Sequence, residues 1–178
     1  MGANWLTTAV AAIVVACGAR PSMAQCKWLP GDGYRGTDDA LYATTAWDPD
    51  GPGPMPEVLA VGGRLRMAGR IDAELIATWD GQRWAALGPG LTGPLPGSAD
   101  DAVFALAIWR GRLCAAVGHL VLPSATYTSS IAVWNGSSWD RIAENLTGVV
   151  GALAEFDGGL VAGGEFTTIG GLAANRVA

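Results

Sequence analysis

The chain has 178 residues, of which 50% are hydrophobic and 15% charged, and this apolar content excludes an intrinsically disordered protein. A net charge of −5 and a pI near 4.7 exclude a basic surface for nucleic acid or anionic lipid. The 26 glycines and 10 prolines show no triplet period, which excludes collagen, and their number argues against long helices. The eight tryptophans indicate a repeat. No feature of the sequence identifies a specific ligand.

The chain begins with an uncharged apolar run at residues 5–17, which is too short to span a bilayer as a permanent helix. Small residues follow, in the pattern of a signal peptidase site that ends at Ala24. We therefore predict a signal peptide at residues 1–24, cleaved between Ala24 and Gln25. The mature protein is then secreted, periplasmic or at the cell surface, with no membrane span.

Two other interpretations of this segment stay open. Val14-Val15-Ala16-Cys17 resembles the lipobox of bacterial lipoproteins, which implies a protein anchored at a lipidated Cys17. The n-region also lacks the Lys or Arg that is typical of a signal peptide, and the alternative is a buried N-terminal strand or helix.

Cleavage after Ala24 leaves two cysteines, Cys26 and Cys114. In an exported chain such a pair is a possible disulfide, which would restrict the unfolded state by closing a long loop. Cys114 also lies in an apolar, strand-like run at residues 113–117, where it can be a small buried side chain. The sequence does not decide between the two.

Residues 25–57 form an N-terminal segment whose Gly/Pro-rich loops are acidic. Asp48 and Asp50 are candidates for a Ca²⁺ site, because Ca²⁺ prefers several oxygen ligands. The EF-hand template fails, and solvated turns are the alternative. Together with Asp38 and Asp39, the same carboxylates could serve a glycosidase. We expect no cofactor.

Three segments further along the chain align on one another. Trp79 and Trp134 are 55 residues apart, as are Trp84 and Trp139, and a Pro/Gly/Asp insertion at 94–101 accounts for the longer spacing between the first two segments. A period in the forties is typical of β-propeller blades. The predicted repeat units are residues 58–102, 103–149 and 150–178, the last of them truncated.

Each unit is expected to fold as an antiparallel four-stranded sheet. Arg110-Gly111 and Asp157-Gly158 predict tight turns between the first two strands. Asp-Gly is the hairpin signal here, because type I′ turns need positive φ at both central residues, which Gly and Asp tolerate. Asp80-Gly81 and Asn135-Gly136 predict the turn before the fourth strand. The fold class is therefore all-β, built from four-stranded blades.

Glycines and tryptophans recur at fixed places in these units. We expect the glycines that end the second strand to lie where a side chain would crowd neighbouring backbone, and the two Trp of each hairpin to meet as a pair. Gly118 aligns with Gly164 at a spacing of 46 residues. The repeat-structural residues are Gly62, Gly63, Trp79, Gly81, Trp84, Gly118, Trp134, Gly136, Trp139, Gly163 and Gly164.

The run Gly-Gly-Glu-Phe-Thr-Thr-Ile-Gly-Gly-Leu-Ala-Ala-Asn-Arg-Val-Ala at 163–178, together with residues 77–84 and 87–90, resembles the tandem repeats of secreted bacterial kelch-like β-propeller proteins. The resemblance covers residues 47 to 178. It implies an incomplete propeller, because the third unit stops where the Trp hairpin should follow. We expect open sheet edges that are covered by a partner or by self-association.

The residues for catalysis are few. The single His, His119, has no nucleophile elbow beside it, and one His with two mature Cys does not make a usual metal site. The leading hypothesis is therefore an exported, non-catalytic binding or surface-interaction protein with a protein or glycan partner. The alternatives are a carbohydrate-active enzyme that uses loop carboxylates, and a truncated fragment without independent function.

Overall fold

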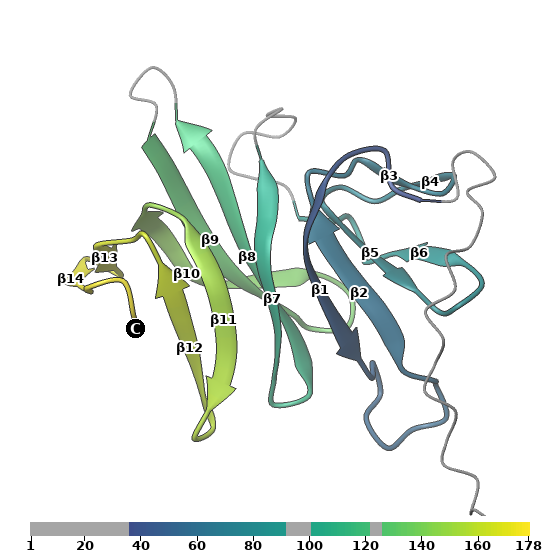
Figure 1. Cartoon of the computed structure of the whole chain (residues 1–178). Coiled ribbons are helices and arrows are strands. Elements are labelled where there is room, and N and C mark those ends of the chain that lie inside the picture. The colour runs from purple at the N-terminus through teal and green to yellow at the C-terminus, as the bar shows by residue number, and fades with distance from the viewer. Residues whose placement is uncertain (1–35, 92–100, 122–125) are drawn as a thin grey trace, which may run out of the picture. The chain divides into compact units, whose positions relative to one another are not determined.

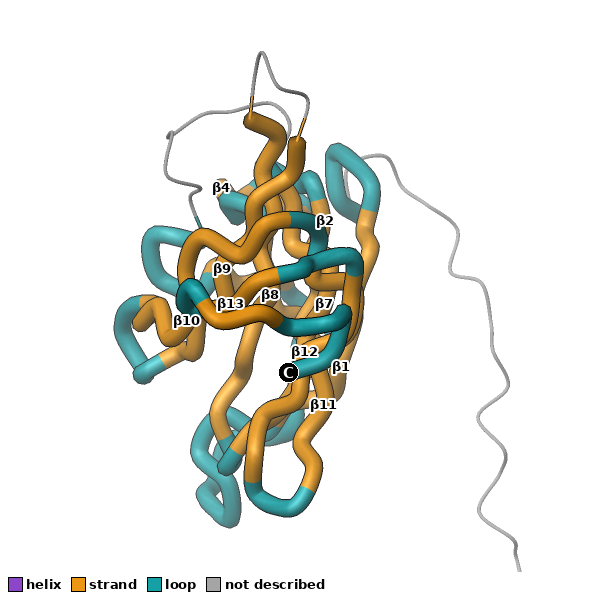
Figure 2. Tube along the Cα trace, turned by 90° about the vertical axis from the view of Figure 1, so that its left-hand side faces the viewer, coloured by secondary structure: helices purple, strands orange, loops and turns teal. Residues whose placement is uncertain are grey.

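Short apolar runs separated by glycine-containing turns fold as β-strands along the whole described chain. The computed structural model describes residues 36–91, 101–121 and 126–178, which all belong to one compact unit, Gly31–Ala178. Within these ranges it contains strands and loops but no helix (Figure 2), and so none that could cross a membrane. The predicted cleavage site at Ala24 and Gln25, the lipobox residue Cys17, and Cys26 lie outside the described residues.

The first sheet has four antiparallel strands, in the order β1-β2-β5-β6 (Figure 1). Its first strand comes from the segment that precedes the predicted unit at 58–102. A small hairpin, β3–β4, is inserted between its second and third strands. The strands are β1 (Leu41–Trp47), β2 (Val58–Gly63), β3 (Met67–Ala68), β4 (Ile71–Asp72), β5 (Ile76–Trp79) and β6 (Trp84–Ala86).

The second sheet is also four-stranded and antiparallel, with its strands in chain order. It has no small hairpin, because its second and third strands continue as one long hairpin. This is where the second unit departs from the other two. The strands are β7 (Ala102–Trp109), β8 (Arg112–Val121), β9 (Thr126–Trp134) and β10 (Trp139–Thr147).

The third sheet is a two-stranded hairpin, extended by a bridge between Gly163 and Val177 at the place of a third strand. A small hairpin follows β12 as another follows β2, and its strands begin at Thr168 and Leu172. The strands are β11 (Val150–Phe156), β12 (Gly159–Gly164), β13 (Thr168–Ile169) and β14 (Leu172–Ala173).

The turns have the conformations that their residues predict. Arg110 and Gly111 have φ values of 52° and 75°, and Asp157 and Gly158 have 48° and 73°, as type I′ turns require. In the Asn135 turn, the side-chain Oδ1 accepts the backbone N–H groups of residues 137 and 138. The Asp80 carboxylate does the same one sheet earlier.

Strand register gives the structural alignment of the three sheets. Each first strand has a β-bulge at the same place, and the residue before the bulge pairs with Gly63 in the first sheet, Val117 in the second and Gly164 in the third. Val117, rather than Gly118, is therefore the counterpart of Gly164. The sequence alignment was wrong by one residue at this point.

Two of the paired glycines are required by close backbone contacts, as expected. A Cβ atom on Gly63 would lie 2.1 Å from the carbonyl oxygen of Ala40, and one on Gly164 would lie 2.1 Å from that of Val149. The same crowding occurs in both sheets because the residue before the first strand lies beside the last glycine of the second strand in each. A larger side chain at either position would displace backbone.

The sheets pack on one another in a repeated way. In the first sheet, the face that carries Trp47, Ala60 and Ile76 is called the front, and the opposite face is called the rear. In the other sheets, the front is the face that carries the residues at the equivalent register positions. Rear residues of the second sheet, such as Leu113 and Ala115, share a core with the front of the first sheet. The front of the second sheet packs on the rear of the third through Ala105, Ala116, Ile131, Leu153, Leu160 and Ala162.

Candidate functional site

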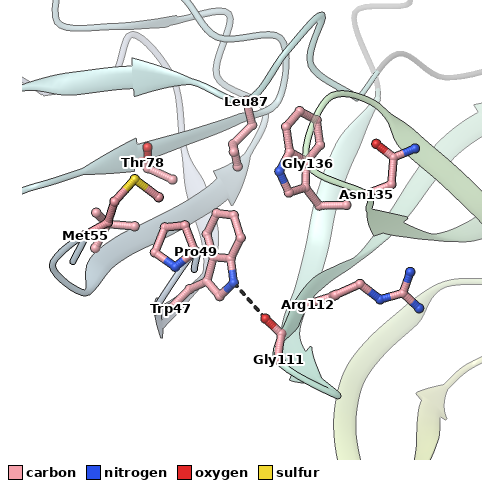
Figure 3. Close-up of a pocket in the computed structure, with 11 residues that line it drawn as sticks. Trp47, Pro49, Met55, Thr78, Leu87, Gly111, Arg112, Asn135 and Gly136 are labelled. Atoms are coloured by element: carbon pink, nitrogen blue, oxygen red, sulfur yellow. Dashed lines mark hydrogen bonds between the residues drawn. The ribbon is translucent and has the colours of Figure 1, made fainter. Parts of the chain in front are cut away.

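A pocket of about 390 Å³ lies between the first two sheets, where β1 and β9 end. Pockets of this size accept a small ligand or one ring of a larger one. Tryptophan rings, aliphatic side chains and a few polar groups line it (Figure 3). The lining residues are Trp47, Pro49, Met55, Val58, Thr78, Leu87, Gly111, Arg112, Trp134, Asn135 and Gly136.

Trp47 fixes one wall of the pocket. It is the last residue of β1, it is buried, and its Nε1–H donates a hydrogen bond of 3.2 Å to the carbonyl oxygen of Gly111 in the second sheet (Figure 3). The same bond recurs one sheet later, where Trp109 donates to Gly158 at 2.9 Å. The Trp47 ring is thus part of the repeated junction between sheets.

Trp134 fixes the opposite wall. Its ring lies 5.3 Å from that of its cross-strand neighbour Trp139, and the rings of Trp79 and Trp84 lie 5.0 Å apart in the first sheet. The predicted Trp pairs are therefore confirmed. Trp134 also packs against the first sheet, since a Cβ on Gly88 would lie 2.8 Å from its ring. Its role is to join the two sheets as well as to line the pocket.

Polar groups lie at the rim. Arg112 is exposed, and its guanidinium carbon lies 5.8 Å from the centre of the Trp109 ring, in a cation–π contact that restricts the side chain. The Asn135 amide donates to Ser138 and Asp140, so it mainly supports its own turn. Arg112 is the charged residue of the lining, but its side chain lies on the front of the second sheet, and in Figure 3 its guanidinium is directed away from Trp47. Rotation of this exposed side chain would bring its charge-assisted hydrogen bonds to a ligand in the pocket.

The loop between β1 and β2 closes the side of the pocket. Met55 is half exposed there, and its backbone N–H donates to Asp50 at 3.1 Å. Pro49 stands beside the ring of Trp47 (Figure 3). A flexible thioether next to two rings makes an adaptable apolar surface.

The predicted calcium residues act as turn supports. The Asp48 carboxylate accepts the backbone N–H of Asp50 at 3.3 Å, and the Asp50 carboxylate accepts that of Met55. Asp48 and Asp50 therefore hold the loop that borders the pocket. Within the described ranges, no group of three or more His, Cys, Asp or Glu side chains could hold a metal ion.

A larger cavity, of about 600 Å³, lies beside the β3–β4 hairpin. Among the described residues that line it, Asp38 carries the carboxylate, which accepts the backbone N–H groups of Arg66 and Met67 at 2.9 Å each. Burial raises the pKa of Asp38, but these hydrogen bonds outweigh burial and hold the pKa below its ordinary value. The carboxylate is thus committed to the hairpin, and the cavity wall begins at Gly36, where the description of this part of the chain starts.

His119 is half-buried on β8, and its imidazole is hydrogen-bonded to the hydroxyl of Thr128, its cross-strand partner. Burial lowers its pKa, and the nearby Asp101 carboxylate opposes this shift. The contact with Thr128 follows from strand pairing. It supports a structural role for His119.

Cys114 is buried on the front of the second sheet and has no disulfide partner among the described residues; burial raises the pKa of its thiol to about 11. Because Cys26 lies outside the described residues, their pairing stays a prediction.

Sequence reasoning missed the pocket, although it found one of its walls. Trp134 was recognised as a repeat residue, but Trp47 and Arg112 were not connected with it. The available signal was the aromatic residue that ends each first strand: Trp47, Trp109 and Phe156. Loops of unequal length follow these residues and conceal the match.

No protein-family model, curated protein or solved structure matches this chain.

Proposed function

We propose that this is an exported, non-catalytic binding protein whose sheets are blades of a kelch-like propeller arrangement. Three features support the arrangement: the strands of the two four-stranded sheets lie in chain order, the front of each sheet packs on the rear of the next, and β7 contacts both β1 and β11. A propeller has these features when its first strands line the centre. Export rests on the predicted signal peptide at residues 1–24.

The observation that carries the binding function is the pocket between the first two sheets. Its walls, Trp47 and Trp134, are held by the junction itself, and Arg112, the charged residue of its lining, has an exposed side chain that can turn toward it. A preformed apolar pocket with a few polar groups is the usual form of a ligand site. The acidic chain places a positive group here, which favours a ligand with a carboxylate or with several hydroxyls.

We therefore propose a glycan ligand, with one ring against the apolar wall and an acidic or hydroxyl group on Arg112. The edges of the Trp rings and the Met55 thioether contact the apolar face of the sugar. On binding, the Arg112 side chain turns toward the sugar and donates to its polar edge. Sugars that carry a carboxylate, such as uronic acids, should bind more tightly than neutral ones.

Calorimetric titration with matched acidic and neutral oligosaccharides tests this function. Acidic chains should bind, and Arg112→Ala should weaken the binding at least about tenfold, which is about 1.4 kcal/mol. Arg83→Ala, a change of an exposed arginine in the Trp hairpin of the first sheet, is the matched control and should leave affinity unchanged. Equal loss with both variants, or no binding of either glycan class, would contradict the proposal.

A second measurement separates binding from catalysis. Incubation with the bound glycan, followed by chromatography of the sugars, should return the glycan intact. Release of shorter sugars, suppressed by Asp48→Asn or Asp50→Asn, would support the glycosidase hypothesis instead. The intact mass of the mature protein tests export, with a start at Gln25 expected and a lipidated start at Cys17 as the contrary outcome.

A further inference from the structure

The front of the third sheet is open where the fronts of the other sheets are covered. Phe156 and Val177 are 75% and 64% exposed. Their counterparts in the first sheet, Trp47 and Ile76, are 5% and 0% exposed. The residue type at these positions is apolar in both sheets, so the difference lies in what covers them.

The rear of the first sheet is open in the complementary way. Leu59 and Leu41 are 41% and 39% exposed. Their counterparts in the second sheet, Leu113 and Val103, are completely buried against the first sheet. One end of the described stack thus presents an uncovered front. The other end presents a rear that is open at Leu41 and Leu59, while the β3–β4 hairpin covers its residues Val61 and Ala77.

These two surfaces match in detail as well as in kind. In the junction between the first two sheets, Val103 packs on Gly62, where a Cβ atom would lie 2.5 Å from its side chain. The counterpart of Gly62 in the third sheet is Gly163, whose open side has no atom nearer than 3.8 Å to such a Cβ. The counterpart of Val103 is the exposed Leu41. The space beside Gly163 and the aliphatic side chain of Leu41 can therefore form the same contact as Gly62 and Val103 do.

We propose that a second copy of this chain covers the third sheet, with the rear of its first sheet on the front of the third sheet of its neighbour. The contact repeats between copies the junction that the chain makes twice within itself. It is heterologous, because different surfaces of the two copies meet, and such contacts build rings or open chains. Uncovered apolar sheet faces of this kind mark interaction sites.

Sedimentation of the full chain over a range of concentrations tests the proposal. The mass should rise above that of one chain with concentration. Phe156→Asp and Leu59→Asp should each shift the association midpoint upward by at least about tenfold, because each places a carboxylate in the contact. Both side chains are exposed in the single copy, so circular dichroism should show both variants folded.

Mixing the two variants gives the sharper result. Each variant keeps one intact surface, and the intact front of Leu59→Asp can meet the intact rear of Phe156→Asp. The equimolar mixture should therefore form a dimer and nothing larger, while each variant alone stays a single chain. Ile142→Asp, at a half-exposed isoleucine of β10 outside both surfaces, is the control and should associate like the wild type.

Three outcomes would overturn the proposal: a wild-type chain that stays a single copy at every concentration, a variant mixture that does not dimerise, or an Ile142→Asp chain that loses association as the other variants do. A single-copy wild type that is captured by a different protein through Phe156 would assign this surface to that partner and would also overturn it.

Discussion

The front faces of the first and third sheets carry apolar residues at the same register positions, yet one face is buried and the other is open. Trp47 lies against the second sheet and donates its N–H to Gly111, whereas Phe156, its counterpart, projects into solvent. The backbone of the two sheets is alike down to the bulge and the crowded glycine. The difference shows that the neighbouring sheet, rather than the strand itself, decides what each residue contributes to stability.

The largest expected effect comes from truncating the two aromatic counterparts. Trp47→Ala should lower the free energy of unfolding by about 3–5 kcal/mol, because it leaves a cavity at the junction of the first two sheets. Phe156→Ala should change it by less than about 0.5 kcal/mol in dilute solution, because the side chain is exposed there. Urea unfolding measures both, and equal losses would break the comparison.

A second pair of substitutions should cost the same in both sheets. Gly63→Ala and Gly164→Ala each force a Cβ into the backbone of their own first strand, so each should cost about 3 kcal/mol whether or not a neighbouring sheet is present. Gly151→Ala, where a Cβ has open space, is the control and should be nearly neutral. Thermal unfolding that finds Gly164→Ala as stable as the control would refute the shared geometry.

A third pair should again separate the sheets, with a smaller effect. Gly62→Ala pushes on the Val103 side chain and should cost about 1–2 kcal/mol, since a side chain yields more easily than backbone. Gly163→Ala, at the open counterpart, should stay within about 0.5 kcal/mol of the wild type in dilute solution. If Gly62→Ala is tolerated equally well, the close packing of the first two sheets is wrong.

The smallest effect concerns the buried thiol on the front of the second sheet. Burial raises the pKa of Cys114 to about 11 from its ordinary 9.0, so above pH 9 the unfolded chain loses this proton before the folded one does. The stabilisation that the buried, protonated thiol gives is fully present below pH 9 and is lost as the pH rises toward 11. The loss in the free energy of unfolding amounts to about 1 kcal/mol at pH 10. Urea unfolding across this range should show a shallower pH dependence in Cys114→Ala, and an unchanged dependence would contradict burial of the thiol.

The strands and turns could be predicted from the sequence because their signals are local. Arg110-Gly111 and Asp157-Gly158 specify their turns without reference to the rest of the chain. The crowding at Gly63 could also be anticipated, since it comes from a strand that pairs within the same sheet. These features depend on hydrogen bonding and sterics over short distances.

The pocket could not be predicted, because it depends on which residues of different sheets come together. Trp47 and Gly111 meet across a junction that no sequence spacing reports, and a ten-residue loop follows Trp47 where a two-residue turn follows Trp109. The second unit has valine where the others have the second glycine of the pair, so the neighbouring Gly118 was matched to Gly164 in place of Val117. The open faces at the two ends were visible only once burial was known.

Hydroxyl-radical footprinting of the wild-type chain at low and high concentration tests most directly whether the same face is a covered junction in one sheet and a docking surface in another. The account predicts that Trp47 is protected at both concentrations, while Phe156 is oxidised in dilute solution and protected when the chain is concentrated. Oxidation of Trp47 as fast as Phe156, or of Phe156 at an unchanged rate at high concentration, would contradict it.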